Sequence, residues 1–304
     1  MEPLQENLGQ LDTEQRNPRT SELDRLSVLE LVATLHAENF TVAEVVERAL
    51  PQVAVAVEQI AARLEQGGRL FYVGAGTSGR LGVLDASECP PTFGVPRDLV
   101  QGIIAGGERA LTTSIEGAED SPEQGVQDLE ARQVTALDVV CGIAASGRTP
   151  YVIGALEYGK RIGAYTIALV NVKQARMAEV AEITLSAVTG AEAVTGSTRL
   201  KAGTAQKMIL NLLTTATMVR LGKVYGNLMV DVRATNFKLR DRALRIVMSA
   251  TGAERSQAED ALNLAEGEVK TTIIMLTASV DVGTARGRLS EANGWVRRAL
   301  ELSD

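Results

Sequence analysis

Histidine and cysteine are scarce in this chain of 304 residues, which holds one histidine and two cysteines. His36 falls in a segment with helical periodicity, far in sequence from both cysteines, so we expect it to be a packing or surface residue. This inventory excludes a zinc site, a Ser-His-Asp triad and a Cys-His pair. Cys89 and Cys141 stand in apolar or helical surroundings, which predicts reduced and buried thiols.

Acidic residues outnumber basic ones, 38 against 31, and long apolar runs are lacking. The formal net charge is −7, and the first 68 residues contain no lysine, which argues against nucleic acid as a partner. No run of about 18 apolar residues could cross a membrane, and residues 1–10 have neither the basic nor the apolar part of a leader. We therefore expect a cytoplasmic protein with no membrane partner.

The middle of the chain alternates between strand and helix patterns. Nearly continuous, β-branched runs predict buried parallel strands at residues 70–74, 99–105, 138–144, 164–170 and 182–188. Helical patterns between them lie at residues 78–87, 122–133 and 149–162. The fold class predicted is α/β, a doubly wound and mostly parallel sheet of five strands.

Helices are expected on both sides of this sheet. Before it, residues 1–20 are polar and extended, and helices follow at 27–36 (capped by Ser27 and Glu30), 41–50 and 51–65. After it comes a long apolar helix at 197–223, then short helices near 239–249, 255–265, 268–278 and 284–301. The expected organisation is an N-terminal helical segment (1–68), an α/β domain (69–226) and a small helical domain (227–304).

Two loops carry the chemistry. In the first hydroxyl loop, residues 74–80, an apolar strand runs into Gly-Thr-Ser and opens a helix. Backbone N–H groups, hydroxyls and a positive helix end meet there, which suits a phosphate. The second hydroxyl loop, residues 144–150, repeats the arrangement and ends with Pro150 in the first turn of a helix. Two such loops predict one anion with a polar body attached.

The first loop has two other interpretations. Gly74, Gly76 and Gly79 fit Gly-x-Gly-x-x-Gly, but a dinucleotide site also needs an acid at the end of the next strand. That strand ends in Gly106-Gly107, and Glu108 comes too late. Glycines that only make tight turns, and hydroxyls that only cap helices, form the second alternative.

Longer motifs identify a resemblance. The two hydroxyl loops are similar to those of the sugar isomerase (SIS) domain, which binds phosphorylated sugars. Four further segments resemble the N-acetylmuramic acid 6-phosphate etherase family over most of the chain, at residues 84–94, 114–120, 195–204 and 222–231. The resemblance implies cleavage of the D-lactyl ether of N-acetylmuramic acid 6-phosphate by syn elimination from the open-chain aldehyde, followed by addition of water. It implies no metal and no cofactor.

By the same resemblance Glu88 is the acid that protonates lactate, and Glu119 is the second carboxylate, the base at carbon 2. Both proton transfers suit carboxylates in a chain without a usable histidine. Spacing alone leaves Glu116 and Asp120 open as alternatives. From charge content alone, each of these acids would be a solvated loop residue.

Substrate contacts are expected from both hydroxyl loops and from the start of the long helix. Ser78, Ser146 and Thr149 are assigned to phosphate or sugar hydroxyls, and Arg148 and Lys201 could neutralise the phosphate or the lactyl carboxylate. The full set of candidate binding residues is Thr77, Ser78, Gly79, Ser146, Gly147, Thr149, Ser197 and Lys201.

The sequence also predicts an oligomeric state and leaves two other functions open. The apolar long helix favours a homodimer through helices near 41–65 and 200–220, with sites near the interface. A non-catalytic sugar-phosphate sensor of the glucokinase regulatory protein type and a sugar-phosphate isomerase stay open as alternatives.

Overall fold

The computed structural model describes residues 12–231 and 237–302. The chain forms two compact units. The first unit holds the chain up to Ser87 together with Asp98–Thr214, and the second unit holds Glu88–Arg97 together with the chain from Thr215 onward. Two of the three boundaries, after Ser87 and after Thr214, fall inside helices, so each of these helices contributes one part to each unit.

Five parallel strands form the sheet of the first unit, as predicted. They are β1 (Leu70–Gly74), β2 (Val100–Ile104), β3 (Val139–Ala144), β4 (Tyr165–Val170) and β5 (Ile183–Ser186). Their order is β2-β1-β3-β4-β5, and every neighbouring pair is parallel. The chain passes from β1 to β2 on one side and then to β3 on the other. This reversal makes the carboxyl ends of β1 and β3 a topological switch point, which is where such sheets bind ligands.

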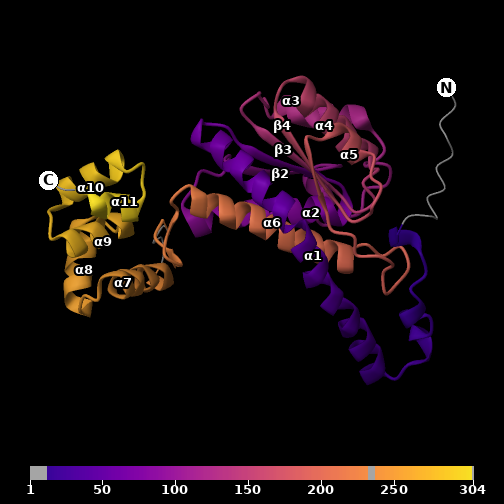
Figure 1. Ribbon diagram of the computed structural model, residues 1–304, viewed down its shortest axis with the longest axis horizontal. Helices are drawn as coiled ribbons and strands as arrows, with labels where there is room; N and C mark the ends of the chain where they lie inside the picture. The colour runs from indigo at the N-terminus through magenta and orange to yellow at the C-terminus, as the bar shows by residue number, and fades with distance from the viewer. Residues whose placement is uncertain (1–11, 232–236, 303–304) are drawn as a thin grey trace. The chain divides into compact units, whose positions relative to one another are not determined.

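Helices cover both faces of the sheet (Figure 1). One face carries α3 (Pro122–Ala131), α4 (Pro150–Arg161) and the short α5 (Met177–Val180), and the other carries α1 (Val28–Glu65), α2 (Gly76–Phe93) and α6 (Lys201–Arg220). Side chains of β1 alternate accordingly. Phe71 and Val73 join the core under α4, whereas Tyr72 points to α2. Both faces are therefore buried, which explains the continuous apolar strands.

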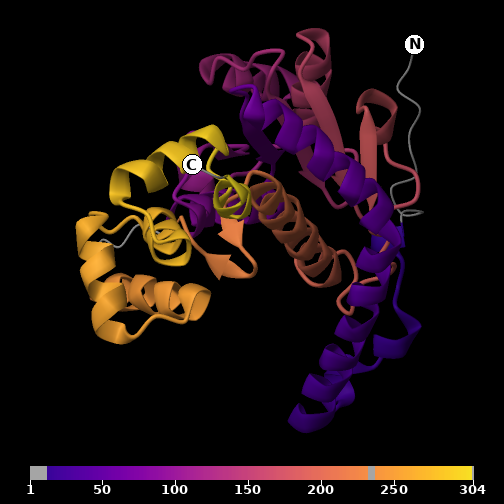
Figure 2. The ribbon, with the colours of Figure 1, turned by 60° about the vertical axis from the view of Figure 1, so that its left-hand side comes forward.

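The three helices expected before the sheet are one helix, so that prediction was wrong. The capping box of Ser27 and Glu30 does begin α1, but the chain then stays helical to Glu65, with Pro51 inside. Thr41 does not cap a new helix; its hydroxyl donates to the carbonyl of Glu38 within the same helix. Burial of one face across the junctions outweighs the single backbone bond that Pro51 removes. The first half of α1 extends beyond the sheet (Figure 2).

The helix expected at residues 78–87 continues through the two prolines after Glu88, so its predicted end was wrong. The helix begins at Gly76 and includes Pro90 and Pro91 before ending at Phe93, where the amide of Gly94 bonds to the carbonyl of Pro90. Two adjacent prolines near a C-terminus cost only the last ladder bonds, so the final turn persists.

The segment before α1 folds against the sheet's loops. Residues 1–11 lie outside the described residues. The rest of the expected extended stretch forms 3₁₀ turns at Asp12–Glu14 and Pro18–Thr20, and Leu23–Arg25 forms another. The Thr20 hydroxyl donates to the carbonyl of Ala193, so local turns are held by a distant loop.

The second unit is mainly helical. Besides the end of α6, it contains the antiparallel β6 (Val224–Tyr225) and β7 (Leu228–Met229), α7 (Phe237–Thr251), α8 (Arg255–Leu264), α9 (Val269–Ala278), α10 (Val282–Glu291) and α11 (Val296–Glu301). The last two were expected as one helix. Positive φ angles at Asn293 and Gly294 break it. The expected helix at 197–223 is shorter at both ends.

Candidate active site

The first hydroxyl loop is a tight strand-to-helix turn. The amide of Gly79 bonds to the carbonyl of Ala75. A Cβ on Gly79 would lie 2.7 Å from the carbonyl oxygen of Gly74, and one on Gly74 would lie 2.7 Å from the Gly79 nitrogen. Both positions therefore need glycine. The first amides of α2, at Gly76, Thr77 and Ser78, precede any intrahelical partner, and amides in this position suit an anion.

Backbone hydrogen bonds hold the second hydroxyl loop in place. Gly147 has a φ of 62°, and its carbonyl accepts from the amide of Met177. The Ser146 oxygen accepts from the amide of Arg148 at 3.3 Å. Thr149 stands at the N-cap of α4, but its side chain makes no capping bond. Its hydroxyl is thus not used for capping, and the substrate contact expected from the sequence stays a prediction.

The acidic turn, residues 116–120, precedes α3 in the chain and contacts the first turn of α4. A turn between Gly117 and Asp120 is closed by a backbone bond of 3.2 Å, with φ of 71° at the glycine. The carbonyl of Glu119 then accepts from the amide of Tyr151 at 3.0 Å. Glu116, Glu119 and Asp120 are all exposed. The structure therefore joins the main chain of Glu119 to the helix that the second hydroxyl loop opens.

Glu88 is exposed and follows Ser78 by ten residues in the same helix, α2. Its neighbour Cys89 is buried, and so is Cys141, as predicted. His36 is a surface residue whose ring contacts that of Phe40.

The start of α6 is already occupied by carboxylates of the chain. Lys201 is 2% exposed, and its ammonium lies 2.7 Å from the carboxylate of Glu38. Glu192 accepts from the amides of Lys201 and Ala202, at 3.0 and 2.9 Å. The structure does not bring the Lys201 ammonium to the hydroxyl loops. Ser197 is half-buried just before the helix.

Burial and hydrogen bonding have opposite effects on a carboxyl pKa, and the balance differs between Glu192 and Glu38. Burial raises the pKa of Glu192, and this outweighs its two backbone bonds. Burial would also raise the pKa of Glu38, but the bonds from Lys201, Arg19 and Asn17 together lower it. Glu38 is thus held as an anion in the interior.

Sequence reasoning missed the buried polar residues beneath the loops. Asp85 accepts from the Tyr72 hydroxyl at 3.1 Å and from the Asn211 amide at 2.6 Å, and burial raises its pKa. Gln206 and Asn171 bond to each other and are also buried. The available signal was a polar side chain, Gln206, inside the apolar stretch of α6.

The described residues lack two features, a cluster of metal ligands and a membrane-spanning helix. No three His, Cys, Asp or Glu side chains gather there as metal ligands would. Within the same residues, every helix is too short or too polar to cross a membrane.

Sheet order, switch point and paired hydroxyl loops together define a SIS-type domain. A family model of the glucokinase regulatory protein N-terminal SIS domain matches residues 52–160. A phosphoheptose isomerase from Francisella tularensis has a similar fold, with a TM-score of 0.52 and 17% identity over 64% of this chain and 100% of its own.

Much closer relatives define the family. N-acetylmuramic acid 6-phosphate etherases from Pectobacterium atrosepticum and Serratia proteamaculans are 55% and 56% identical to this chain over 294 residues. The alignments cover 97% of this chain in both cases, and 97% and 99% of the relatives. This chain belongs to the N-acetylmuramic acid 6-phosphate etherase family, which confirms the resemblance carried by the motifs.

Proposed function

We propose that this protein cleaves the D-lactyl ether of N-acetylmuramic acid 6-phosphate, giving N-acetylglucosamine 6-phosphate and D-lactate. Relatives that carry the name of this etherase align with this chain over nearly their whole length. N-acetylmuramic acid is a sugar of the bacterial cell wall, so the reaction serves recycling of that material. A phosphorylated sugar carries about −1.5 to −2 charges at pH 7 and does not cross a membrane unaided, which supports a cytoplasmic location.

The chemistry needs two proton transfers and one departing alkoxide. In the open-chain form, the aldehyde at carbon 1 stabilises the carbanion left when a base removes the proton from carbon 2. The bond between carbon 3 and the ether oxygen then breaks, and an acid protonates that oxygen, so lactate leaves and an unsaturated aldehyde remains. Water adds at carbon 3, and carbon 2 regains a proton. Each positioned transfer supplies roughly 10²–10⁴-fold.

In this proposal Glu119 is the base at carbon 2 and Glu88 is the acid. The observation that carries the function is the backbone bond between Glu119 and Tyr151. It holds a carboxylate-bearing turn at the start of α4, next to Ser146 and Thr149 of a loop suited to phosphate. A substrate anchored there by its phosphate would present its carbon chain to a fixed base.

The experiment measures D-lactate released from N-acetylmuramic acid 6-phosphate. Glu88→Gln should reduce release by at least ~10²-fold and still exchange the carbon 2 proton with solvent. Glu119→Gln should lose both. Matched controls are Glu116→Gln and Asp120→Asn, exposed acids in the same turn, which we expect to stay within a few-fold of wild type. Near-normal release by Glu88→Gln would refute its role.

The same assay separates the other functions. A sugar-phosphate sensor would bind the substrate and release no lactate, and an isomerase would change the sugar without releasing lactate. The family model that names the regulatory protein matches about a third of this chain. The etherase relatives cover almost all of it, which favours the enzyme.

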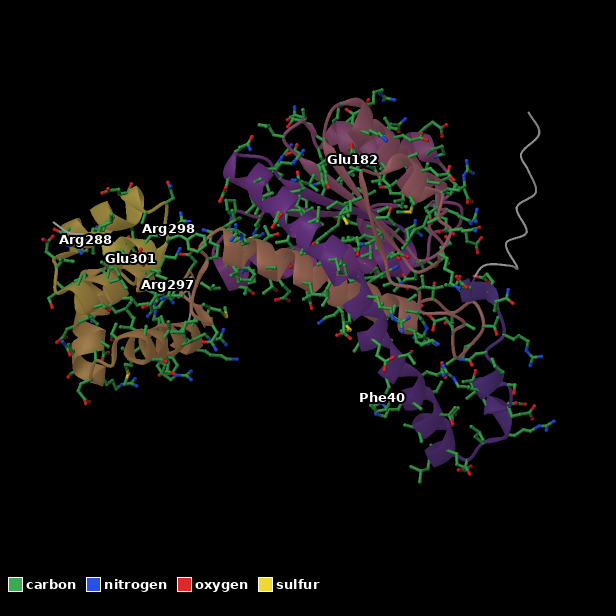
Figure 3. The ribbon with its side chains drawn as sticks, in the orientation of Figure 1. Phe40, Glu182, Arg288, Arg297, Arg298 and Glu301 are labelled. Carbon is green, nitrogen blue, oxygen red and sulfur yellow. The ribbon has the colours of Figure 1, made fainter. Side chains whose placement is uncertain are left out.

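A homodimer is the proposed assembly. Phe40 is 69% exposed on the part of α1 that extends beyond the sheet (Figure 3), and Leu212 on α6 is 36% exposed. Exposed apolar side chains on these two helices support an interface there. Leu213, in contrast, is fully buried within the chain. A test of assembly therefore belongs at Leu212, because a charge at Leu213 would unfold the protein.

A further inference from the structure

The helix that carries Glu88 has few hydrogen bonds of its own just after that residue. Pro90 and Pro91 lack an amide proton, so two of the backbone bonds that would tie this turn of α2 to the preceding one are missing. The division between the two compact units falls between Ser87 and Glu88. Contacts of residues 88–97 within the second unit therefore take a larger part in holding Glu88 in place.

The second unit holds the end of α2 through a contact between main chains. Gly94 follows the helix with a φ of 66°, and its amide bonds to the carbonyl of Pro90 at 3.0 Å. A Cβ on Gly94 would lie 2.2 Å from the carbonyl oxygen of Asp231, far closer than real Cβ contacts come. On either side of this glycine, Phe93 and Val95 are buried. The end of α2 therefore rests directly on the main chain at Asp231.

Asp231 is itself fixed by two lysines of the second unit. Its Oδ2 lies 2.6 Å from the ammonium of Lys270, on α9, and 3.2 Å from the ammonium of Lys223. Because Lys223 precedes β6 and Asp231 follows β7, the ion pairs close the base of this hairpin. Next to the base, a Cβ on Gly222 would come within 2.9 Å of the Trp295 ring, just before α11. The hairpin that supports Gly94 is thus held by two parts of the C-terminal helical region.

We propose that Gly94, Asp231 and Lys270 are positioning residues for Glu88, and that holding this acid is one role of the C-terminal helices. The inference rests on the proposed function, in which Glu88 protonates the departing ether oxygen. An acid transfers its proton only within hydrogen-bond reach, ~2.6–3.2 Å between heavy atoms, and a displacement of ~1 Å can cost roughly 10²-fold in rate.

The proposed base does not share this support. The turn that carries Glu119 belongs to the first unit, and its backbone is bonded to Tyr151 of α4 in the same unit. Protonation of the leaving lactate therefore depends on the second unit, whereas removal of the carbon 2 proton does not. The two steps can be measured separately, as D-lactate release and as exchange of the carbon 2 proton with solvent.

Gly94→Ala tests the contact with both measurements, made on N-acetylmuramic acid 6-phosphate in deuterated water. Ala must push the end of α2 away from Asp231, so D-lactate release should fall on the order of 10²-fold. Exchange at carbon 2, which needs Glu119, should stay within a few-fold of wild type. Gly252→Ala is the matched control, because this glycine of the second unit also has a positive φ, 74°, but open space around it. It repeats the backbone strain without the clash and should change neither rate.

A double-mutant cycle shows whether Gly94 acts through Glu88. Glu88→Gln combined with Gly94→Ala should release lactate no more slowly than Glu88→Gln alone, because an acid that is absent cannot be misplaced. Lys270→Met is a milder variant that removes the 2.6 Å ion pair and keeps the backbone contact. It leaves Asp231 its second lysine, so we expect a several-fold loss of lactate release with unchanged carbon 2 exchange. This variant carries the test should Gly94→Ala fail to fold.

Three results would overturn the proposal. They are lactate release near wild type in Gly94→Ala or Lys270→Met, an equal loss of lactate release and carbon 2 exchange, and losses that multiply in the double variant. An equal loss would show general damage to the fold, and multiplied losses would show that Gly94 acts independently of Glu88. Wild-type protein that releases no D-lactate would refute the proposed function, and this inference with it, whereas the three results above arise only in an active enzyme.

Discussion

Lys201→Met separates a structural role of this lysine from a substrate-binding one. Its ammonium is 2.7 Å from the Glu38 carboxylate, and the side chains of the two residues are 3% and 4% exposed. Removing one partner of a buried ion pair strands the other, which costs about 3–5 kcal/mol. Glu38 keeps bonds from Asn17 at 2.7 Å and from Arg19 at 3.0 Å, which favours the lower end. For a unit of about 200 residues, this lowers the melting temperature by roughly 6–20 °C.

Thermal unfolding and lactate release, measured on the same samples, test the prediction. Lys201→Met should melt early yet retain most of its kcat/KM where it is folded. Adding Glu38→Gln should recover part of the stability, because the stranded charge is gone. Lys207→Met, an exposed lysine on the same helix, is the control and should stay within about 0.5 kcal/mol. An unchanged melting temperature with a large rise in KM would refute the structural role and return Lys201 to the substrate.

Further predictions concern pH, binding and assembly. The pKa of Glu38 is lowered in the folded chain, so its contribution to stability is present above the ordinary Glu value, about 4.3, and is lost as pH falls below it. The stability gap between wild type and Glu38→Gln, followed by urea unfolding, should therefore narrow under acid. Ser146→Ala should weaken inorganic phosphate binding by ~1–3 kcal/mol in calorimetry, whereas Ser87→Ala, an exposed hydroxyl bonded to its own helix, should not; equal effects would contradict the loop assignment. Leu212→Asp should yield monomers in sedimentation and Leu264→Asp, 68% exposed in the second unit, should not; a fully active wild-type monomer at micromolar concentration would refute the dimer.

The strands and the two loops were predictable because their signals are local. A buried parallel strand needs only a short apolar run, and a phosphate loop needs only glycines and hydroxyls between a strand and a helix. Predictions of helix ends were wrong where tertiary packing outweighed a local stop signal. Pro51, Pro90 and Pro91 each argued for an end, yet each lies within a helix.

Pairing across long separations could not be predicted. Lys201 reads as a free cation beside a hydroxyl-rich loop, but its partner Glu38 is 163 residues away. Ser78 and Gln206, which share a hydrogen bond, are 128 residues apart. In both cases the residue type was visible in the sequence, and the fold decided whether it faces a ligand or another side chain. The expected role of Lys201 in substrate binding is therefore the one that the fold overturns.

Two glycines near the acidic turn have a packing role that could not be predicted from the sequence. The sequence presents glycines as makers of turns, but Gly125 and Gly154 lie inside α3 and α4. A Cβ on Gly125 would come within 2.1 Å of the Tyr151 carbonyl oxygen, and one on Gly154 within 2.3 Å of the Pro122 carbonyl oxygen. The two helices therefore meet backbone to backbone at their first turns, one starting just after Glu119 and the other at the second hydroxyl loop. Their closeness lets the Tyr151 amide reach the Glu119 carbonyl, so two glycines inside helices set how near the proposed base lies to the second hydroxyl loop.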